Sequence, residues 1–484
     1  MNNAKQPHFM PPKTFLLLGT ALLAGCITNP DYKAPDIALP QTWGQQASLQ
    51  QGQPLGPWSG WWKAFGDPTL NQLVQDALDE NLEIAMQTAR VEEYRARLGV
   101  SRADRWPTLD AQAQATRERT PATLNPIPGA SPSTDNRYAL SAVLGYEVDL
   151  WGRLRREREA AEALLQESSF ARDAVRLQVA TDVVAGYFEL RAASRQLAIT
   201  RQTLESRLET LRLQEIRHAA GDIDAFALQQ ARSELEAVRA ELPARVQRKQ
   251  LLEGALAVLV GMPPEALWKD LQWMSNGTES LQLPRTAPDF LPSNLLERRP
   301  DIRAAEAALQ AATAGIGATQ AQRMPRLNLS ALIGTAATSS GDLFTDPAGT
   351  WALGATALGP LWDFGRSRSR VETAEARAAQ AEALYRLTVT NAFNEVRNAL
   401  IVYEHSGARA EATRNLVETL EENHRLARIR YDEGYISFLN FLDVERAVLT
   451  ARIAMEEAQR DQLTSAANLS KALGGGWYNP TSKE

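Results

Sequence analysis

The sequence predicts a mainly α-helical chain made of two tandem copies of one unit, each with a strand hairpin followed by a long helical hairpin. Three observations predict this fold class. Two stretches are far longer than ordinary helices, glycines recur in them at one fixed offset, and short runs of alternating polar and apolar residues precede each of them.

The longest uninterrupted stretch lies between Gly365 and Gly434 and contains no proline and one internal glycine, Gly407. Apolar residues recur along it at helical spacing, which predicts one helix: Leu384, Leu387, Phe393, Val396, Leu400 and Tyr403. At a rise of about 1.5 Å per residue this helix is about 100 Å long. Helices in compact proteins rarely exceed about 25 residues, so a coiled coil or an elongated assembly is expected.

Six glycines form three pairs with a common offset of 213 residues: Gly152 with Gly365, Gly221 with Gly434, and Gly261 with Gly474. This offset is far longer than the period of about 20 to 50 residues found in solenoids, so we interpret it as duplication of a large unit. The two units are residues 67–261 and 291–474. A linker at 262–290 separates them, and a tail at 475–484 follows.

Each unit is expected to contain two helices joined by a tight turn. Gly221 and Gly434 lie where a glycine ends a helix, and return helices are predicted over 224–260 and 437–473. In the first long helix leucine recurs every seven residues, which is typical of a supercoiled seam: Leu190, Leu197, Leu204 and Leu211. A partner protein that reaches the turns would contact Gly221, Asp222, Gly434 and Tyr435.

The strand hairpins are predicted from a two-residue alternation of apolar and polar side chains. It begins after Pro107, over 109–116 and 138–150 with a loop at 120–137, and again after Pro325, over 327–331 and 351–362. Strands of about ten residues can cross a bilayer when tilted, and aromatic residues at their ends are typical of outer-membrane barrels. Two hairpins in a soluble protein remain the alternative from these segments alone.

Four strands cannot close a barrel, and open strand edges are not tolerated in lipid. Several chains must therefore contribute strands. A homotrimer would provide twelve strands and a barrel with an open lumen. The long helices of three chains would pack beside one another into an α-helical barrel joined to the β-barrel.

The N-terminus has the layout of a secretory signal peptide, with basic residues before a short apolar segment over 1–25. It ends in Leu23-Ala24-Gly25-Cys26, which resembles the lipobox of bacterial lipoproteins. The resemblance implies cleavage before Cys26 and acylation of that residue, which anchors the chain in the outer membrane. The alternative is a plain signal peptide with an incidental cysteine.

Residues 26–66 are rich in Pro, Gly, Gln and Trp and are expected to form an extended arm. Its aromatic residues are expected to dock it onto the body of the protein rather than to bind a ligand: Trp58, Trp61, Trp62 and Phe65. Asp67-Pro68 is suited to the start of a helix. This helix is predicted to continue to Trp106-Pro107, where proline ends it.

Composition excludes several classes of function. The net charge of −6 argues against nucleic acid as a partner. Four histidines and a single cysteine give no metal-ligand spacing, and no catalytic motif is found, so neither an enzyme nor a cofactor is expected.

Arginines cluster where each long helix begins: Arg153, Arg155, Arg156 and Arg158, and Arg366, Arg368 and Arg370. Cations at a helix N-terminus oppose the macrodipole, so the helix itself does not explain them. They either meet anionic lipid head groups or form a paired, solvated face with nearby glutamates.

Together these features resemble the outer membrane factor family of TolC/OprM-like channels, most closely its NodT-like lipoprotein branch. The most specific stretch runs from Leu291 to Glu306 and contains Arg298-Arg299-Pro300-Asp301, with support from Trp61-Trp62 and from residues 430–434. The resemblance implies a trimeric outer-membrane conduit for passive export. It implies a periplasmic adaptor and an inner-membrane transporter as partners, in an efflux or type I secretion system.

The resemblance also implies a gate at the periplasmic end, in the return helix of the second unit. Leu439 is carried over as an apolar constriction, Asp443 as an acidic ring, and Arg446 as its tethering cation. Without the resemblance, Asp443 and Arg446 are an ordinary surface pair at i,i+3. The matching positions of the first unit, Gln230 and Ser233, carry no such pair.

The main rival function is a periplasmic coiled-coil lipoprotein that acts as a scaffold or adaptor. It predicts a protein that becomes soluble once Cys26 is removed. The channel predicts a trimer that requires detergent and conducts ions.

Overall fold

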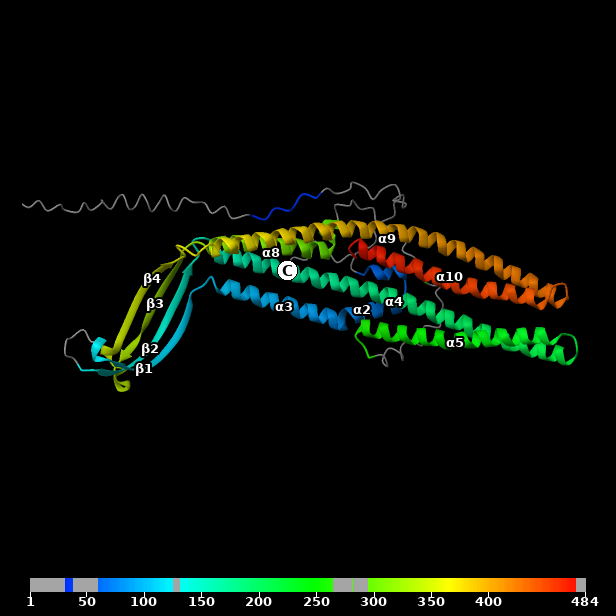
Figure 1. The fold of residues 1–484 in the computed structure, drawn as a ribbon, viewed down its shortest axis with the longest axis horizontal. Coiled ribbons are helices and arrows are strands. Elements are labelled where there is room, and N and C mark those ends of the chain that lie inside the picture. Colours follow the sequence, from blue (N-terminus) through cyan, green and yellow to red (C-terminus); the bar gives the residue numbers. More distant parts are fainter. Residues whose placement is uncertain (1–30, 38–59, 125–130, 264–280, 282–294, 476–484) are drawn as a thin grey trace, which may run out of the picture. The chain divides into compact units, whose positions relative to one another are not determined.

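The computed structural model describes residues 31–37, 60–124, 131–263, 281 and 295–475 (Figure 1). The signal peptide, Cys26, Trp58 and most of the linker at 262–290 lie outside these residues. The chain forms two compact units. Among the described residues, the sheet unit contains 31–35, 93–166 and 306–383, and the helical unit contains 36–37, 60–92, 167–263, 281, 295–305 and 384–475.

The sheet unit is organised around four antiparallel strands in the order β1-β2-β3-β4 (Figure 1). Their bounds are β1 (Thr108–Thr120), β2 (Ser133–Val148), β3 (Arg326–Ala337) and β4 (Gly349–Leu358). Three short 3₁₀ helices lie in the strand connections: η2 (Ala122–Leu124), η6 (Ser340–Asp342) and η7 (Asp346–Ala348). The two predicted strand hairpins are confirmed, and β2 and β3 join them into one sheet.

The predicted strand limits were partly wrong. The first hairpin is longer than expected, because its register continues to the pair of Thr120 with Ser133, inside the predicted loop. The last strand ends at Leu358 rather than at Trp362. Pro360 has no N–H to donate to a ladder, which explains the early end.

Two helical hairpins follow the strand hairpins. They are α4 (Arg153–Ala219) with α5 (Ala225–Val260), and α9 (Arg366–Asp432) with α10 (Phe438–Ala472). Both long helices contain 67 residues, as the glycine spacing predicted. Among the recurring leucines of α4, Leu190 and Leu197 are buried, and Leu204 and Leu211 are half-buried.

All six glycines of the repeat have a positive φ, between 76° and 92°. Only glycine adopts this left-handed conformation without steric cost, so the backbone favours glycine at each of these six positions. At the two turns the amide of Asp222 donates to the carbonyl of Arg217 at 2.9 Å, and that of Tyr435 donates to Arg430 at 2.8 Å. Both turns thus end their helix with the same capping geometry.

The prediction of one helix from Asp67 to Trp106 is wrong in one respect. The structure has two helices there, α2 (Pro68–Glu80) and α3 (Leu82–Ala103). Asn81 is extended at the break, with φ −64° and ψ 126°. The side-chain oxygen of Asn81 accepts hydrogen bonds from the backbone amides of Glu83 at 2.9 Å and Ile84 at 3.2 Å. Its side-chain nitrogen Nδ2 donates to the carbonyl of Leu259 at 2.8 Å. Asn81 therefore caps α3 and links it to the end of α5.

The main core of the helical unit lies where η1 (Trp61–Phe65) and α2 pack against α4, α5 and α10. Phe65 and Leu70 are fully buried in it with Tyr187 of α4. Trp61 and Trp62 are also buried, so these aromatic residues dock this part of the arm as expected and offer no open ligand platform. Within the described residues, no helix has the length and apolar character needed to cross a membrane.

Asp67 connects this core to α4 through buried hydrogen bonds. It caps α2 by accepting from the amides of Thr69 at 2.9 Å and Leu70 at 3.3 Å. Its second oxygen accepts from the hydroxyl of Tyr187 at 2.5 Å and from Arg191 at 2.7 Å. Burial is the main cause that raises the pKa of Tyr187 above its ordinary value, and the hydrogen bond to Asp67 raises it further.

The specific stretch around Arg299 has a structural role in the helical unit. Arg299 precedes α8 (Pro300–Ala321) and follows the short α7 (Leu295–Arg298). Its guanidinium donates to Asp301 at 2.8 Å, to Glu395 of α9 at 2.6 Å, and to the carbonyl of Ala472 at the end of α10 at 2.9 Å. Burial alone lowers the pKa of Arg299, but its bonds to the two carboxylates outweigh burial and the pKa is raised. One buried cation therefore holds three elements together.

Candidate functional site

The turns of the two helical hairpins present the residues that the sequence singled out. Each return helix starts with a side-chain cap: Asp224 accepts from the amide of Ala227 at 2.9 Å, and Ser437 accepts from Asn440 at 3.2 Å. Tyr435 is 77% exposed at the second turn. A large exposed side chain beside a fixed turn is suited to contact with a partner protein.

Leu439 lies in the first turn of α10 and is 43% exposed. The offset of 213 residues makes Phe226 the equivalent of Leu439 in the first repeat. Phe226 lies in the first turn of α5 and is 69% exposed. The sequence analysis missed Phe226, although the offset of 213 residues would have identified it. Both return helices therefore present one large apolar side chain at the same position.

Arg446 bonds to two carboxylates on different helices. It donates to Asp443 at 2.9 Å, as the i,i+3 spacing predicts, and to Glu234 of α5 through both Nε, at 3.1 Å, and Nη2. Glu234 is largely buried, whereas Asp443 is 60% exposed. The pKa of Arg446 is raised, and the largest cause is its hydrogen bond to Glu234. Arg446 thus connects the two return helices, and its stronger partner is the one that the sequence analysis missed.

A second cation, Arg207 of α4, lies behind this pair and is buried. It bonds to Glu445 of α10 and lies 3.9 Å from Glu234 of α5. Glu445 also lies 3.6 Å from His424 of α9. The ion-pair network, defined as Arg207, Glu234, Glu445, Arg446 and His424, therefore contains side chains from both long helices, α4 and α9, and from both return helices, α5 and α10.

An apolar cluster packs beside the ion-pair network near the turns. The rings of Tyr431 and Phe441 stack with centroids 5.2 Å apart, and Leu442 is fully buried. The hydroxyl of Tyr431 accepts hydrogen bonds from Gln214 at 2.8 Å and Arg217 at 3.2 Å, both on α4. Tyr431 thus joins the second helical hairpin to the first by packing and by hydrogen bonding.

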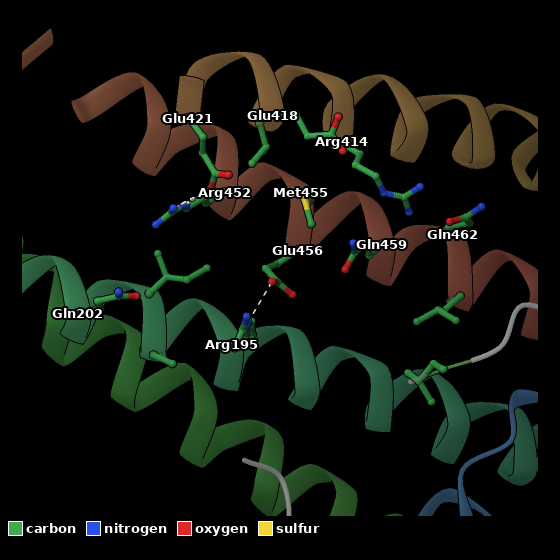
Figure 2. Close-up of a pocket in the computed structure, with 15 residues that line it drawn as sticks. Arg195, Gln202, Arg414, Glu418, Glu421, Arg452, Met455, Glu456, Gln459 and Gln462 are labelled. Carbon is green, nitrogen blue, oxygen red and sulfur yellow. Dashed lines mark hydrogen bonds and ion pairs between the residues drawn. The ribbon is translucent and has the colours of Figure 1, made fainter. Parts of the chain in front are cut away.

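An open polar cavity of about 710 Å³ lies between α4, α9 and α10 (Figure 2). Arg195 projects into it from α4 and lies 3.4 Å from Glu456 of α10, and Arg452 of α10 pairs with Glu421 of α9 at 2.6 Å. Figure 2 shows that Gln459 and Met455 of α10 also face this space. Besides this polar cavity, the two helical hairpins have two separate apolar contacts, which are the main core and the apolar cluster.

The arginines at the start of α4 pair with carboxylates. Arg153 bonds to Glu147 and Glu157, each at 2.8 Å, and Arg156 bonds to Asp31 and Glu159, each at 2.8 Å. This favours the paired face over lipid head groups for these two residues. In the second cluster Arg368 pairs with Glu372 at 2.8 Å and remains largely exposed.

Among the described residues, no three His, Cys, Asp or Glu side chains gather closely enough to hold a metal ion. The proposed lipid-anchor residue, Cys26, lies outside the described residues.

Comparison with known proteins identifies the family. The sequence profile of the outer membrane efflux protein family matches residues 73–262 and 291–475. The chain is 34% identical over 463 residues to the outer membrane protein OprJ of Pseudomonas aeruginosa, with 95% of each chain covered. It is 30% identical over 463 residues to the probable outer membrane lipoprotein SilC of Salmonella typhimurium, which covers 94% of this chain and 97% of SilC.

Solved structures agree with the sequence relatives. The structure of the outer-membrane channel OprN superposes with a TM-score of 0.85 at 31% identity, over 93% of this chain and all of that one. The structure of CusC superposes with a TM-score of 0.80 at 27% identity over the same shares. These relatives are channel and efflux proteins. They therefore do not favour the alternative function, a periplasmic coiled-coil lipoprotein that acts as a scaffold or adaptor. The chain belongs to the outer membrane efflux protein family and is an efflux channel of the outer membrane that extends into the periplasm.

Proposed function

We propose that three copies of this chain form one conduit, with a twelve-stranded β-barrel joined to an α-helical periplasmic barrel. The observation that carries the proposal is the four-stranded sheet, in which β1 and β4 have no strand partner on one side among the described residues. Such edges must be paired within a bilayer, and four strands are too few to close a barrel. Neighbouring copies provide the missing partners.

The alternation of side chains supports a lipid-facing surface on this sheet. Leu109, Leu144, Leu329 and Leu353 occupy connected positions of the register on one face, and all are at least 38% exposed. Gln112 and Gln114 lie on the opposite face, where a water-filled lumen would be. Apolar residues outward and polar residues inward are typical of outer-membrane barrels.

The conduit is passive, and its energy comes from an inner-membrane transporter connected through a periplasmic adaptor. The adaptor contacts the turns at Gly221, Asp222, Gly434 and Tyr435, since Tyr435 is exposed there. Relatives include outer membrane proteins of an antibiotic efflux pump and of a toluene efflux pump, both from Pseudomonas putida. By analogy, the cargo of this channel is small organic molecules, exported by a tripartite efflux system.

The periplasmic end is closed by Leu439, Asp443 and Arg446. In a threefold assembly each residue forms a ring. A leucine ring hinders ions by dewetting, and an aspartate ring favours cations. The bond of Arg446 to Glu234 holds α10 against α5 in this closed arrangement, and its bond to Asp443 lies within α10.

Conductance in planar bilayers tests the channel directly. The full-length protein purified in detergent is expected to insert and to conduct ions weakly at rest, and Arg446→Ala is expected to raise this resting conductance. Arg425→Ala is the matched control, because Arg425 forms an exposed i,i+3 pair with Glu422 within α9 alone. Absence of any conductance in the wild-type protein and in Arg446→Ala would argue against a channel.

The lipid anchor is tested by Cys26→Ala, examined in detergent. We expect the variant to remain trimeric, because strand pairing rather than acylation holds the copies together. A water-soluble monomer would contradict the barrel and favour a scaffold. Mass spectrometry of the wild-type N-terminus determines whether Cys26 is acylated.

A further inference from the structure

His424 of α9 is held at the ion-pair network by two contacts. Its Nε2 lies 3.6 Å from Oε1 of Glu445, and its ring stacks on Phe441 with centroids 5.5 Å apart. Phe441 and Glu445 are four residues apart on α10, so both lie on the helix face that meets His424. The imidazole is therefore fixed beside the carboxylate of Glu445.

The carboxylate of Glu445 has a second cationic partner on the other helical hairpin. Arg207 of α4 bonds to its Oε2, so the two partners use different oxygens of one carboxylate. The side chain of Arg207 is 4% exposed, and its Nε is buried without a hydrogen-bond partner among the described residues. Its other carboxylate neighbour is Glu234 of α5 at 3.9 Å. Glu445 is thus the residue through which Arg207 holds α10.

His424 is open to water and can take up a proton where it lies. Its side chain is 30% exposed, and with Arg207 and Glu445 it lines an open cavity of about 310 Å³ between α4, α9 and α10. Histidine is the side chain whose charge ordinarily changes between about pH 5 and pH 8. Acidification over this range therefore places a second positive charge beside the pair of Arg207 with Glu445.

The other charges around His424 decide the effect of this proton. Those on α9 and α10 belong to the same hairpin as His424 and stay with it when the two hairpins separate: Glu421, Arg428, Glu445 and Arg452. Glu421 and Arg452 also neutralise each other in a pair at 2.6 Å. From the first hairpin, as far as the structure describes it, Arg207 is the charged side chain that lines this cavity, whereas Glu234 contacts Arg207 from its other side. Separation of the hairpins therefore removes a positive charge from the surroundings of His424.

We propose that His424 is a pH-sensitive switch of the periplasmic gate, in which the protonated imidazole competes with Arg207 for Glu445 and favours separation of the two helical hairpins. The switch rests on the proposed gate and adds a signal that opens it. When His424 is neutral, Arg207 bonds to Glu445 unopposed and holds α10 against α4. When His424 is charged, the two cations repel each other in the closed arrangement, whereas His424 keeps Glu445 as its partner in the open one. Coupling between two events is reciprocal, so protons that bind the open arrangement more tightly also open it.

Single-channel recording of the full-length protein in planar bilayers at pH 8 and at pH 5.5 tests the switch. Asp and Glu side chains ordinarily stay ionised over this range, so the carboxylates of the network do not titrate with His424. We expect the open probability of the wild type to rise at least about fivefold on acidification, the lower end of typical couplings. His424→Gln cannot be protonated and should stay closed at both pH values. His424→Lys is charged throughout and should have the higher open probability at both.

Two other histidines provide matched controls. His218 lies at the first turn, where its Nδ1 is 3.1 Å from the carbonyl oxygen of Ile223, and His405 is exposed on α9. His218→Gln and His405→Gln should keep the full rise in open probability. Circular dichroism and native mass spectrometry of each variant verify that its fold and its number of copies are those of the wild type.

The outcomes separate the switch from the proposed function. If the wild type conducts but its open probability does not change with pH, or if His424→Gln responds as the wild type does, the switch is wrong and the channel remains. A wild type that closes on acidification would also overturn the switch, because His424 would then hold the hairpins together. If neither the wild type nor Arg446→Ala conducts at either pH, the proposed function and the switch both fail.

Discussion

The cation Arg446 has two carboxylate partners that differ in burial. Glu234 lies on another helix and is 13% exposed, whereas Asp443 lies on the same helix and is 60% exposed. A charge-assisted hydrogen bond shielded from solvent is worth more than an exposed ion pair. The bond to Glu234 therefore contributes more than the bond to Asp443 to the contact between the two return helices, α5 and α10.

This difference predicts an order of effects on gating. Glu234→Gln is expected to raise the open probability about tenfold, since charged hydrogen bonds contribute about 1.5–3 kcal/mol. Asp443→Asn is expected to raise it less than about fivefold, because an exposed pair contributes up to about 1 kcal/mol. Single-channel recording measures both variants. A larger effect of Asp443→Asn would assign the restraint to the pair within α10.

Tyr187 gives a prediction for pH dependence. Burial raises the pKa of its hydroxyl above the ordinary value of 10.0. Above about pH 10 the unfolded chain loses this proton while the folded chain keeps it, so the unfolded state is favoured. The contribution to stability is complete below about pH 10 and is lost as the pH rises further.

Thermal unfolding between pH 9 and pH 11, followed by circular dichroism, measures this effect. Tyr187→Phe has no hydroxyl to titrate, so its melting temperature should decline less steeply than that of the wild type. Exposed tyrosines such as Tyr435 provide the control, since Tyr435→Phe should leave the slope unchanged. Equal slopes for Tyr187→Phe and the wild type would contradict the buried hydroxyl.

At the scale of elements, single polar residues determine where helices end and which helices they contact. Asn81 ends α2, caps α3 and donates to the last turn of α5. Arg299 joins the start of α8 to α9 and to the end of α10. Hydrogen bonds of this kind satisfy backbone groups that a helix end leaves unpaired, so their loss affects two elements at once.

Asn81→Ala is expected to destabilise the helical unit by about 2 kcal/mol, because it removes the cap and the bond to Leu259. Asn81→Ser keeps a capping oxygen but loses the amide donor, so we expect about half of this loss. Denaturant unfolding followed by circular dichroism measures both. Asn415→Ala, at an exposed position within α9, is the neutral control, and an equal loss there would show that the effect is not specific to the cap.

At the scale of the whole molecule, the exposed aromatic side chains are expected to belong to contacts between copies. Phe364 is 91% exposed and packs edge-on against Trp362, which is also largely exposed. Such apolar side chains on an isolated chain indicate an interaction surface. A neighbouring copy in the proposed trimer would cover these side chains.

Phe364→Ala is therefore expected to lower the temperature at which the trimer dissociates in detergent, by several degrees. Phe344→Ala is the matched control, because Phe344 is 79% exposed but lies in the connection between β3 and β4. Heating followed by native electrophoresis measures the dissociation. The contact would be refuted if both variants behaved like the wild type, or if Phe344→Ala had the larger effect.

The sequence alone determined the fold class, the duplication, the long helices and their turns. Periodicity and obligatory glycines are local properties, since a positive φ restricts the residue at each turn whatever surrounds it. The pair of Asp443 with Arg446 was also predictable, because i,i+3 spacing on a helix brings two side chains together.

Only the tertiary structure decided which distant residues meet. Glu234, Arg207 and Tyr431 join the helical hairpins through side chains that are hundreds of residues apart or lie on different helices, and no local pattern indicates such contacts. The break at Asn81 was missed for the same reason, because its bond to Leu259 exists only once α5 is packed beside it. Local geometry fixes each element, and packing between elements selects the pairs that hold them together.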